Sequence, residues 1–317
     1  MPKRLTTIPS HTYQPTTDRN IMRFVDREGD WTHYWIKSKK MFVPAVNHII
    51  KTGYPKGERF YSYLLSTQPD AAERKLRSAG EEGSRTHEAI RNLLEGKLVD
   101  VKTRFYHELT SRYEPLSPDE WDNLEAFAKW CAVYQPQVLI SEHAVWSPTH
   151  LYAGTVDFIG SILVPENDKC FGKSSWGKRI LVLLDWKTSG GIWDDYELQV
   201  AAYREAALET IFKNQPVPEF GSLWTGIVRL GTKHKSGFEM KVWNEEISDN
   251  NFRLFQSVLD IYDKKAGFEF KPEIRHIPSH FSLKIPRLRL KKTKAKKPPE
   301  SEREDHMAEA ATSAVTK

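Results

Sequence analysis

Charged side chains interrupt two of the most apolar segments of this sequence. Asp185 directly follows the apolar run 180–184, and Lys187 comes two positions later. Because they lie two positions apart on a predicted strand, both side chains point to the same side of the sheet. Burying either ion alone costs several kcal/mol, so the two groups need each other, a metal ion or a charged substrate. The Asp-x-Lys pattern therefore indicates either a structural ion pair at a strand end or part of a catalytic site.

A second carboxylate favours the catalytic interpretation. Asp157 lies 28 positions before Asp185, in the apolar segment 151–163, where Gly154 allows another part of the chain to come close. If the two strands pair through the loop 165–178, both carboxylates face one site. Neighbouring carboxylates repel each other unless a cation neutralises them, and oxygen ligands suit Mg²⁺ or Mn²⁺. The spacing therefore predicts a site for one of these cations.

Glu142 is a further candidate ligand. It lies in the predicted strand 138–146, where strict alternation would place it in an otherwise apolar row. That row is formed by Val138, Ile140, Ala144 and Trp146. A lone carboxylate on the inner side of a strand needs a partner, so we predict that Glu142 supplies a third oxygen ligand or accepts a hydrogen bond behind the ligands.

Predicted helices carry three more polar side chains. His87 lies on the inner face of the helix 71–95, where it is either a hydrogen-bonded core histidine or a metal ligand. Gln199 and Tyr203 are one turn apart on the helix 194–212, so both can face the strand ends and reach the lysine or a phosphate. The alternative for these two is an exposed glutamine and a core tyrosine.

The order of predicted elements indicates an α/β protein: a central mixed sheet flanked by helices, preceded by a helical part at about 40–135. One helix in that part begins at Ser117-Pro-Asp-Glu120, which has the spacing of a capping box. The expected strands are 138–146, 151–163, 180–187, 223–230 and 238–243, within a catalytic sheet at about 136–245. A closing helix is expected at about 249–265, and residues 1–20 are expected to be flexible.

Taken together, these motifs resemble the RecB-like branch of the PD-(D/E)XK nuclease superfamily. In chain order they are Gly83-Ser-Arg-Thr-His87-Glu-Ala-Ile, Gly154-Thr-Val-Asp157-Phe, Asp185-Trp-Lys187-Thr-Ser and Gln199-x-x-x-Tyr203. The similarity spans roughly residues 42–230 and includes Phe42-Val-Pro-Ala-Val-Asn-His-Ile-Ile at its start. It implies a restriction-endonuclease-like fold within one nuclease domain at 21–283, and metal-dependent hydrolysis of DNA phosphodiester bonds.

The resemblance also implies roles for individual residues. His87, Asp157, Asp185 and the backbone carbonyl of Trp186 would hold the metal, with Glu142 as a less secure match. Lys187 would orient or activate the attacking water. Gln199 and Tyr203 would support the lysine and the substrate phosphate. Several relatives bind an iron–sulfur cluster through four cysteines, whereas this chain has only Cys131 and Cys170, so no cluster is expected.

Composition limits the class of protein and its location. Hydrophobic residues make up 39% of the 317 residues and charged residues 28%, which excludes wholesale disorder. The absence of a long apolar stretch or a secretory leader predicts a soluble protein that does not enter a membrane. Few cysteines indicate a reducing intracellular compartment. We expect the cytoplasm of a bacterium or a phage-infected host, with the mitochondrion as the alternative.

The excess positive charge lies in the last part of the chain. Residues 284–299 contain eight basic and no acidic side chains, and residues 300–317 contain five acidic and two basic ones. Such a tail, 284–317, is either a solvated and disordered segment or a contact for DNA phosphates. If it contacts DNA, we expect it to raise affinity without setting sequence preference.

The leading hypothesis is therefore a Mg²⁺- or Mn²⁺-dependent DNA exonuclease acting in recombination, replication or repair, with DNA ends as substrate and recombination or replication proteins as further partners. One alternative is an endonuclease of the same superfamily. Another is a non-catalytic DNA-binding protein on the same fold, in which the basic tail and the aromatic residues Trp31, Tyr34 and Trp35 contact the strand. The complete set of motif residues favours the enzyme.

Overall fold

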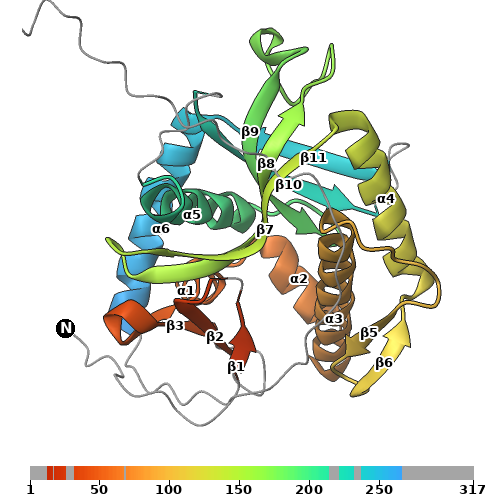
Figure 1. Cartoon of the computed structure of the whole chain (residues 1–317). Helices are drawn as coiled ribbons and strands as arrows, with labels where there is room; N and C mark the ends of the chain where they lie inside the picture. The colour runs from red at the N-terminus through yellow and green to blue at the C-terminus, as the bar shows by residue number, and fades with distance from the viewer. Residues whose placement is uncertain are drawn as a thin grey trace, which may run out of the picture.

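The computed structural model describes residues 13–16, 18–25, 32–67, 69–213, 221–231 and 237–265. Within these ranges the chain is an α/β protein whose central sheet has five strands, in the order β11-β10-β9-β8-β7. The β9–β10 pair is parallel and the other pairs are antiparallel, so the sheet is mixed as expected (Figure 1). The strands are β7 (Gln137–Ser147), β8 (Tyr152–Leu163), β9 (Arg179–Lys187), β10 (Leu223–Leu230) and β11 (Phe238–Trp243).

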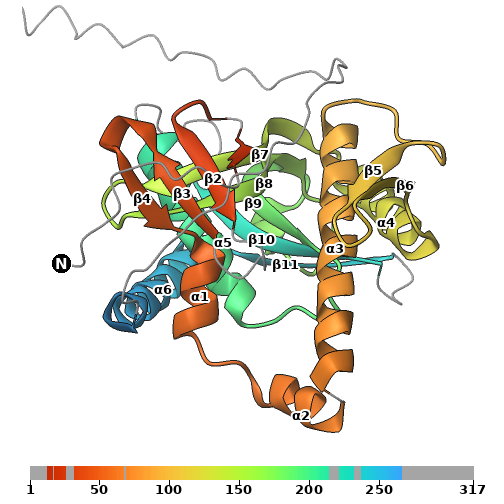
Figure 2. The ribbon, with the colours of Figure 1, turned by 90° about the horizontal axis from the view of Figure 1, so that it is seen from below.

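Helices cover both faces of this sheet (Figure 2). One face packs against α1 (Val46–Gly53), α5 (Asp195–Thr210) and α6 (Glu245–Lys265). The other face packs against α3 (Pro69–Leu94) and α4 (Pro118–Tyr134). Each face buries its own cluster of apolar side chains, as expected for a sheet whose central strands are apolar on both sides. The connections are α2 (Glu58–Ser66), the antiparallel pair β5 (Arg104–His107) and β6 (Arg112–Pro115), and the short helix η2 (Lys173–Ser175).

Most predicted elements are confirmed to within a few residues. The five strands and the helices at 71–95, 194–212 and 249–265 correspond to β7–β11, α3, α5 and α6. The capping box is also confirmed, because the Ser117 hydroxyl accepts the Glu120 N–H while the Glu120 carboxylate accepts the Ser117 N–H. Among the described residues, no helix combines the length and apolar character needed to cross a bilayer.

The N-terminal part differs from the prediction. The strands β1 (Tyr13–Pro15), β2 (Ile21–Val25), β3 (Thr32–Ile36) and β4 (Met41–Pro44) form an antiparallel sheet before the first helix, with the short helix η1 (Lys37–Lys39) in the turn between β3 and β4. The predicted flexible segment 1–20 therefore contains a strand, and the helical part begins only at Val46. These strands are short and their polar and apolar residues alternate irregularly, so the hydrophobic periodicity of the sequence does not predict them.

The N-terminal sheet packs against the β7–β8 edge of the central sheet. Ile21, Tyr34 and Ile36 share an apolar cluster with Ala144, Trp146 and Ala153. Tyr34 and Trp35 are only 2% and 4% exposed, so the structure contradicts the idea that they contact a DNA strand. Tyr34 packs between the two sheets instead, whereas Trp35 packs on Phe24 and Phe42 within the N-terminal sheet. Trp31, the third aromatic residue of that proposal, lies outside the described residues.

Strand β7 is irregular beside the predicted site. Its pairing with β8 shifts register between Val138 and Ile140, and Glu142 has a positive φ of 46°. Val138 consequently packs on the α3–α4 face, whereas Ile140 packs on the α1–α5–α6 face. The prediction of one continuous row from Val138 to Trp146 is therefore wrong. An extra residue in a strand bends it and re-aims side chains, and bulges of this kind are frequent beside functional sites.

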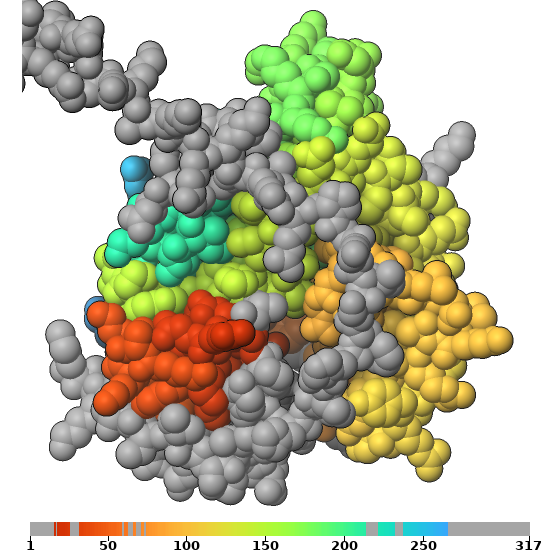
Figure 3. Space-filling view, in the orientation of Figure 1, coloured from red at the N-terminus to blue at the C-terminus, as the bar shows by residue number. Residues whose placement is uncertain are grey.

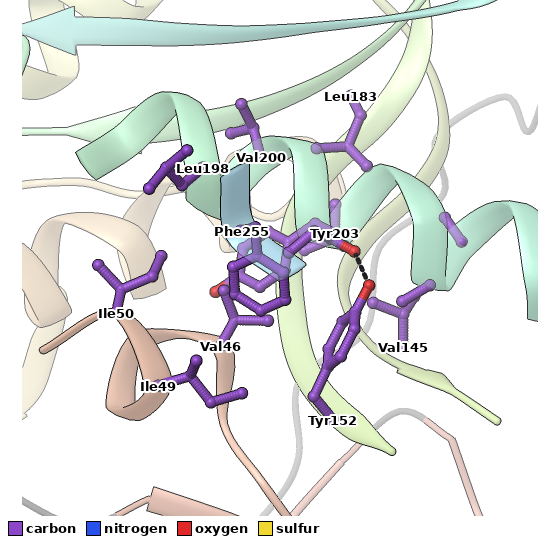
Figure 4. Packing of buried hydrophobic residues seen from close by; sticks show 14 of the residues in the cluster. Val46, Ile49, Ile50, Val145, Tyr152, Leu183, Leu198, Val200, Tyr203 and Phe255 are labelled. Atoms are coloured by element: carbon purple, nitrogen blue, oxygen red, sulfur yellow. Dashed lines mark hydrogen bonds between the residues drawn. The ribbon is translucent and has the colours of Figure 1, made fainter. Parts of the chain in front are cut away.

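Gly154 is required by the packing of α5 on β8. A Cβ at this position would lie 2.2 Å from Cε1 of Tyr203, whose side chain is 4% exposed within the core. The close-up in Figure 4 shows Tyr203 among the buried apolar residues of the α1–α5–α6 face, such as Val145 and Phe255. The dashed line beside it is the hydrogen bond from the Tyr152 hydroxyl to the Ala202 carbonyl. The prediction that Gly154 permits close approach is confirmed.

Replacing Gly154 by alanine should therefore destabilise the protein by about 1–3 kcal/mol, the usual range for overpacking a core. The added methyl group must displace the ring of Tyr203 or the backbone of β8. Chemical denaturation measures the loss. Gly190→Ala is the matched control, because a Cβ there meets no atom within 4 Å. Equal stability of the two variants would contradict this close contact.

His33 should make stability depend on pH. Burial, followed by the neighbouring charge of His48, lowers the pKa of His33 from 6.5 to about 3. The unfolded chain binds a proton below pH 6.5 and the folded chain excludes it, so this contribution is complete above 6.5 and is lost as the pH falls toward 3. By about pH 5 the loss should reach about 2 kcal/mol.

The measurement compares denaturation of the wild type and His33→Phe between neutral pH and about pH 5. The variant lacks the titrating group, so its stability should fall less over this interval, whatever its absolute stability. Parallel curves for the two proteins would show that His33 is not kept neutral by the fold.

Candidate metal centre

Neighbouring strands carry the predicted acidic residues: Glu142 lies on β7, Asp157 on β8 and Asp185 on β9. The last residue pair of the ladder between β8 and β9 is Phe158 with Leu184. The two aspartates are the neighbours of this pair, just outside the ladder. Beyond that point the N–H of Trp186 donates to Oδ2 of Asp157 at 2.8 Å instead of to a strand neighbour. The end of this ladder thus holds the Asp157 carboxylate against the backbone of β9.

Helix α3 brings His87 to the same place. Its Nδ1 lies 3.4 Å from Oδ2 of Asp157. Helix residues Ala89 and Ile90 are fully buried against the sheet, which fixes this face of α3 toward the strands. A Cβ at Gly83 would lie 3.3 Å from Oγ1 of Thr188, so glycine there lets the helix lie close to the end of β9.

His87, Glu142 and Asp157 form a group that could hold a metal ion. One potential ligand atom from each residue lies within 4.8 Å of those of the other two. Asp157 is buried, while His87 and Glu142 are partly exposed. One imidazole nitrogen and two carboxylates from β7, β8 and α3 therefore converge at a place that solvent can reach.

Without a metal ion, protons balance the charges of this group. Burial, reinforced by the charge of Asp157, raises the pKa of Glu142 to about 8, although His87, Arg91 and Arg23 act in the opposite direction. Burial also acts on His87, but the charge of Asp157 and its hydrogen bond prevail and raise the pKa of His87 to about 9. A protonated His87 and a protonated Glu142 thus relieve the repulsion that a divalent cation would otherwise relieve.

Asp157 remains ionised in this environment. Burial would raise its pKa, but the charge of His87, the hydrogen bond from His87 and the nearby Lys187 together lower it. The N–H of Trp186 contributes in the same direction. Asp157 is therefore the permanent negative charge of the group, and Glu142 is the carboxylate whose ionisation depends on a nearby cation.

Lys187 is held by a buried polar network. Its ammonium lies 2.5 Å from Oδ2 of Asp185 and donates to Oε1 of Gln199 at 3.0 Å. The Gln199 amide donates to Oδ1 of Asp185 at 3.0 Å and to the Tyr203 hydroxyl at 3.1 Å. Three contacts thus orient Gln199, and Gln199 and Asp185 orient the lysine. Burial, together with the charge of Asp157, raises the pKa of Asp185 to about 6, while Lys187 opposes the shift.

The structure brings most of the predicted residues together, in two adjacent groups. His87, Asp157 and Glu142 form the cluster of potential ligands, and Asp185, Lys187, Gln199 and Tyr203 form the network. Asp185 is not part of the ligand cluster, because its oxygens face the lysine and the glutamine. Its role as a ligand stays a prediction, as does that of the Trp186 carbonyl. Gln199 is buried rather than exposed, and Tyr203 is both a core residue and a partner of Gln199.

Tyr196 belongs to the lysine network and was missed by the sequence interpretation. Nζ of Lys187 lies 4.6 Å from the centre of its ring, and its hydroxyl donates to the Ser189 hydroxyl at 3.1 Å. Such a ring stabilises an ammonium through its electron-rich face. The signal was present, since Tyr196, Gln199 and Tyr203 are spaced by three and four residues and so share one face of α5.

The predicted basic tail, 284–317, lies outside the described residues, so its contact with DNA stays a prediction. No family model matches the chain, and no curated protein matches it either. The function is therefore inferred from the chemistry of the cluster and the lysine network.

Proposed function

We propose that the chain is a metal-dependent deoxyribonuclease that hydrolyses phosphodiester bonds. The observation that carries this proposal is the position of the His87–Glu142–Asp157 cluster next to a buried lysine held by Asp185 and Gln199. A purely structural ion pair needs neither the glutamine that bonds three polar groups nor a neighbouring carboxylate whose pKa burial raises. The sequence motifs that resemble those of RecB-like nucleases lie at these same positions, which supports the restriction-endonuclease-like interpretation of the sheet.

The donor set fits a divalent cation. Carboxylate oxygens suit Mg²⁺ and Mn²⁺, and the imidazole of His87 favours Mn²⁺ over Mg²⁺ because nitrogen ligands bind the softer cation better. His87, Glu142 and Asp157 would hold the ion, which would leave other coordination positions for water and phosphate oxygens. When bound, the ion supplies polarisation of the phosphoryl oxygen and lowers the pKa of a bound water.

The protein's own groups would act on the other side of the reacting phosphate. The Lys187 ammonium is a compact positive charge with three donors, so it can orient the attacking water and stabilise the negative charge that develops on the phosphate. Asp185 and Gln199 keep this ammonium pointed at the site. Tyr203 orients Gln199 through a hydrogen bond, and the ring of Tyr196 packs against the ammonium of Lys187.

Among nucleases, we propose an exonuclease acting on DNA ends during recombination, replication or repair, because the motifs resemble exonucleases of the RecB-like branch. An endonuclease remains the second candidate. The non-catalytic DNA-binding alternative is weakened by the burial of Tyr34 and Trp35, which were to provide its stacking surface.

End-labelled single- and double-stranded DNA and covalently closed circular DNA, incubated with Mn²⁺, Mg²⁺ or EDTA, test this proposal. We expect the linear substrates to be degraded with either metal, the circle to survive, and EDTA to abolish cleavage. Cleavage of the circle would identify an endonuclease. Intact DNA in every metal, together with salt-dependent binding, would contradict the enzyme and favour the DNA-binding protein.

A further inference from the structure

The alternation of side chains along β2 places Arg23 on the face of the N-terminal sheet that packs against β7 and β8. Ile21, two residues earlier on β2, packs against β7 and β8 in the cluster with Ala144 and Ala153, and alternation puts Arg23 on the same side. Arg23 is also the direct cross-strand partner of Tyr34, whose hydroxyl lies 3.0 Å from Oγ1 of Thr155 on β8. Thr155 precedes Asp157 by two residues. Arg23 is thus aimed at the β7–β8 edge where the cluster lies.

Arg23 has a donor that the described part of the chain leaves without a partner. Its Nε is buried, yet no hydrogen-bond acceptor faces it there. A buried donor of a charged group is costly to leave unpaired, and a guanidinium needs anionic or carbonyl oxygens. The residue as a whole is only partly buried, so part of its side chain is open to solvent.

Arg91 approaches the cluster from the other side. It lies one turn after His87 on α3, so both residues share a face of the helix. Its side chain is 38% exposed, and its ion pair with Glu88 is long, at 3.6 Å between NH2 and Oε1. An exposed pair of this kind contributes little, which leaves the guanidinium free to exchange partners. In Figure 3 the N-terminal sheet, in red, lies on the left, and the lighter orange part of the chain lies on the right.

Both guanidinium groups are close enough to Glu142 to lower its pKa, although burial is the dominant influence on that group. The described residues thus place two cations beside the β7 end of the cluster, and Lys187 on β9 lies beyond Asp157 at the opposite end. Neighbouring strands are about 4.8 Å apart, so about 10 Å separates β7 from β9, more than one phosphate group spans.

We propose that Arg23 and Arg91 bind a backbone phosphate of the polynucleotide adjacent to the one that is cleaved, on the Glu142 side of the site. This inference rests on the proposed function for the identity of its ligand. Guanidinium groups match phosphate geometry and are weakly hydrated, which suits a partly buried contact better than an ammonium. The two arginines hold the strand in register, and they are positioning residues, because the neighbouring phosphate does not react.

The first experiment measures binding of a single-stranded oligonucleotide in EDTA as a function of salt concentration, with the full chain. Each phosphate contact releases counterions, so the association constant falls as the salt concentration rises. Arg23→Gln and Arg91→Gln should each make the slope of the logarithm of this constant against the logarithm of salt concentration less steep by about 0.7. Each should also weaken binding about tenfold at low salt. Arg23→Lys should keep most of the slope. Arg253→Gln, on the exposed side of α6, is the matched control and should bind like the wild type.

Further readouts separate phosphate binding from a structural role. Both glutamine variants should keep the wild-type melting temperature and the wild-type stabilisation by Mn²⁺, and their cleavage should show a raised KM with little change in kcat. Wild-type slopes in both variants would overturn the inference, as would reduced slopes that appear only together with a lower melting temperature. Reduced slopes in a protein that cleaves no DNA would instead contradict the proposed function and leave the phosphate contact standing.

Discussion

Replacing Lys187 by alanine is expected to lower the turnover of DNA cleavage by on the order of 10³-fold, the usual effect of removing a group that stabilises charge in the transition state. Asp185 and Gln199 hold the ammonium beside the cluster. Among the described residues, Lys187 is the cation that this network orients, and the substitution removes it. Single-turnover cleavage with saturating Mn²⁺ measures this effect without contributions from product release.

Two observations would make this result specific. Mn²⁺ should still stabilise Lys187→Ala against heat, because the potential ligands are unchanged. Lys241→Ala is the matched control, since Lys241 also pairs with a carboxylate, Glu197, at 2.6 Å but lies on the exposed surface of β11. It should cleave like the wild type. Undiminished cleavage by Lys187→Ala would contradict the role given to the lysine.

Asp157→Asn should abolish both metal binding and cleavage. Asparagine keeps an oxygen that can accept the Trp186 N–H, but it removes the permanent negative charge of the group, which pairs with His87. At a Mn²⁺ concentration 100-fold above Kd, the wild type should gain about 2.7 kcal/mol of stability from binding, and the variant should gain almost nothing. Denaturation with and without Mn²⁺ measures the difference.

The matched control for this substitution is Asp260→Asn, an aspartate on the exposed side of α6. It changes the net charge by the same amount, so it should keep both the Mn²⁺ effect and the activity. If Asp157→Asn retained the full Mn²⁺ stabilisation, Asp157 would not be a ligand. The lysine network would then need another explanation for its place beside two carboxylates.

The central sheet could be predicted from the sequence because its signals are local. The run 180–184 is apolar at every position and ends in charged residues, as a strand buried on both faces does. Pairing of β8 with β9 followed from the loop between them, and it brought Asp157 and Asp185 to neighbouring strands as expected. The site could thus be predicted mainly from two features of the sequence: polar residues at the ends of apolar strands, and the pairing of those strands.

The remaining features depend on contacts between distant segments. The bulge in β7 aims Glu142 at His87 and Asp157, and strict alternation along one strand does not reveal such a shift. The division of labour between the two aspartates is also tertiary, because Gln199 on α5 captures Asp185 while His87 on α3 approaches Asp157. The N-terminal sheet packs through short, irregular strands whose apolar faces are complete only when it docks on β7 and β8.

The central claim is that His87, Glu142 and Asp157 together hold one divalent cation. Anomalous diffraction from crystals soaked in Mn²⁺, recorded at the manganese absorption edge, tests it most directly. We predict one strong peak at about 2.2 Å from a nitrogen of His87 and from carboxylate oxygens of Glu142 and Asp157. Fully soaked crystals with no peak at these three residues, or with manganese bound only elsewhere, would contradict the account.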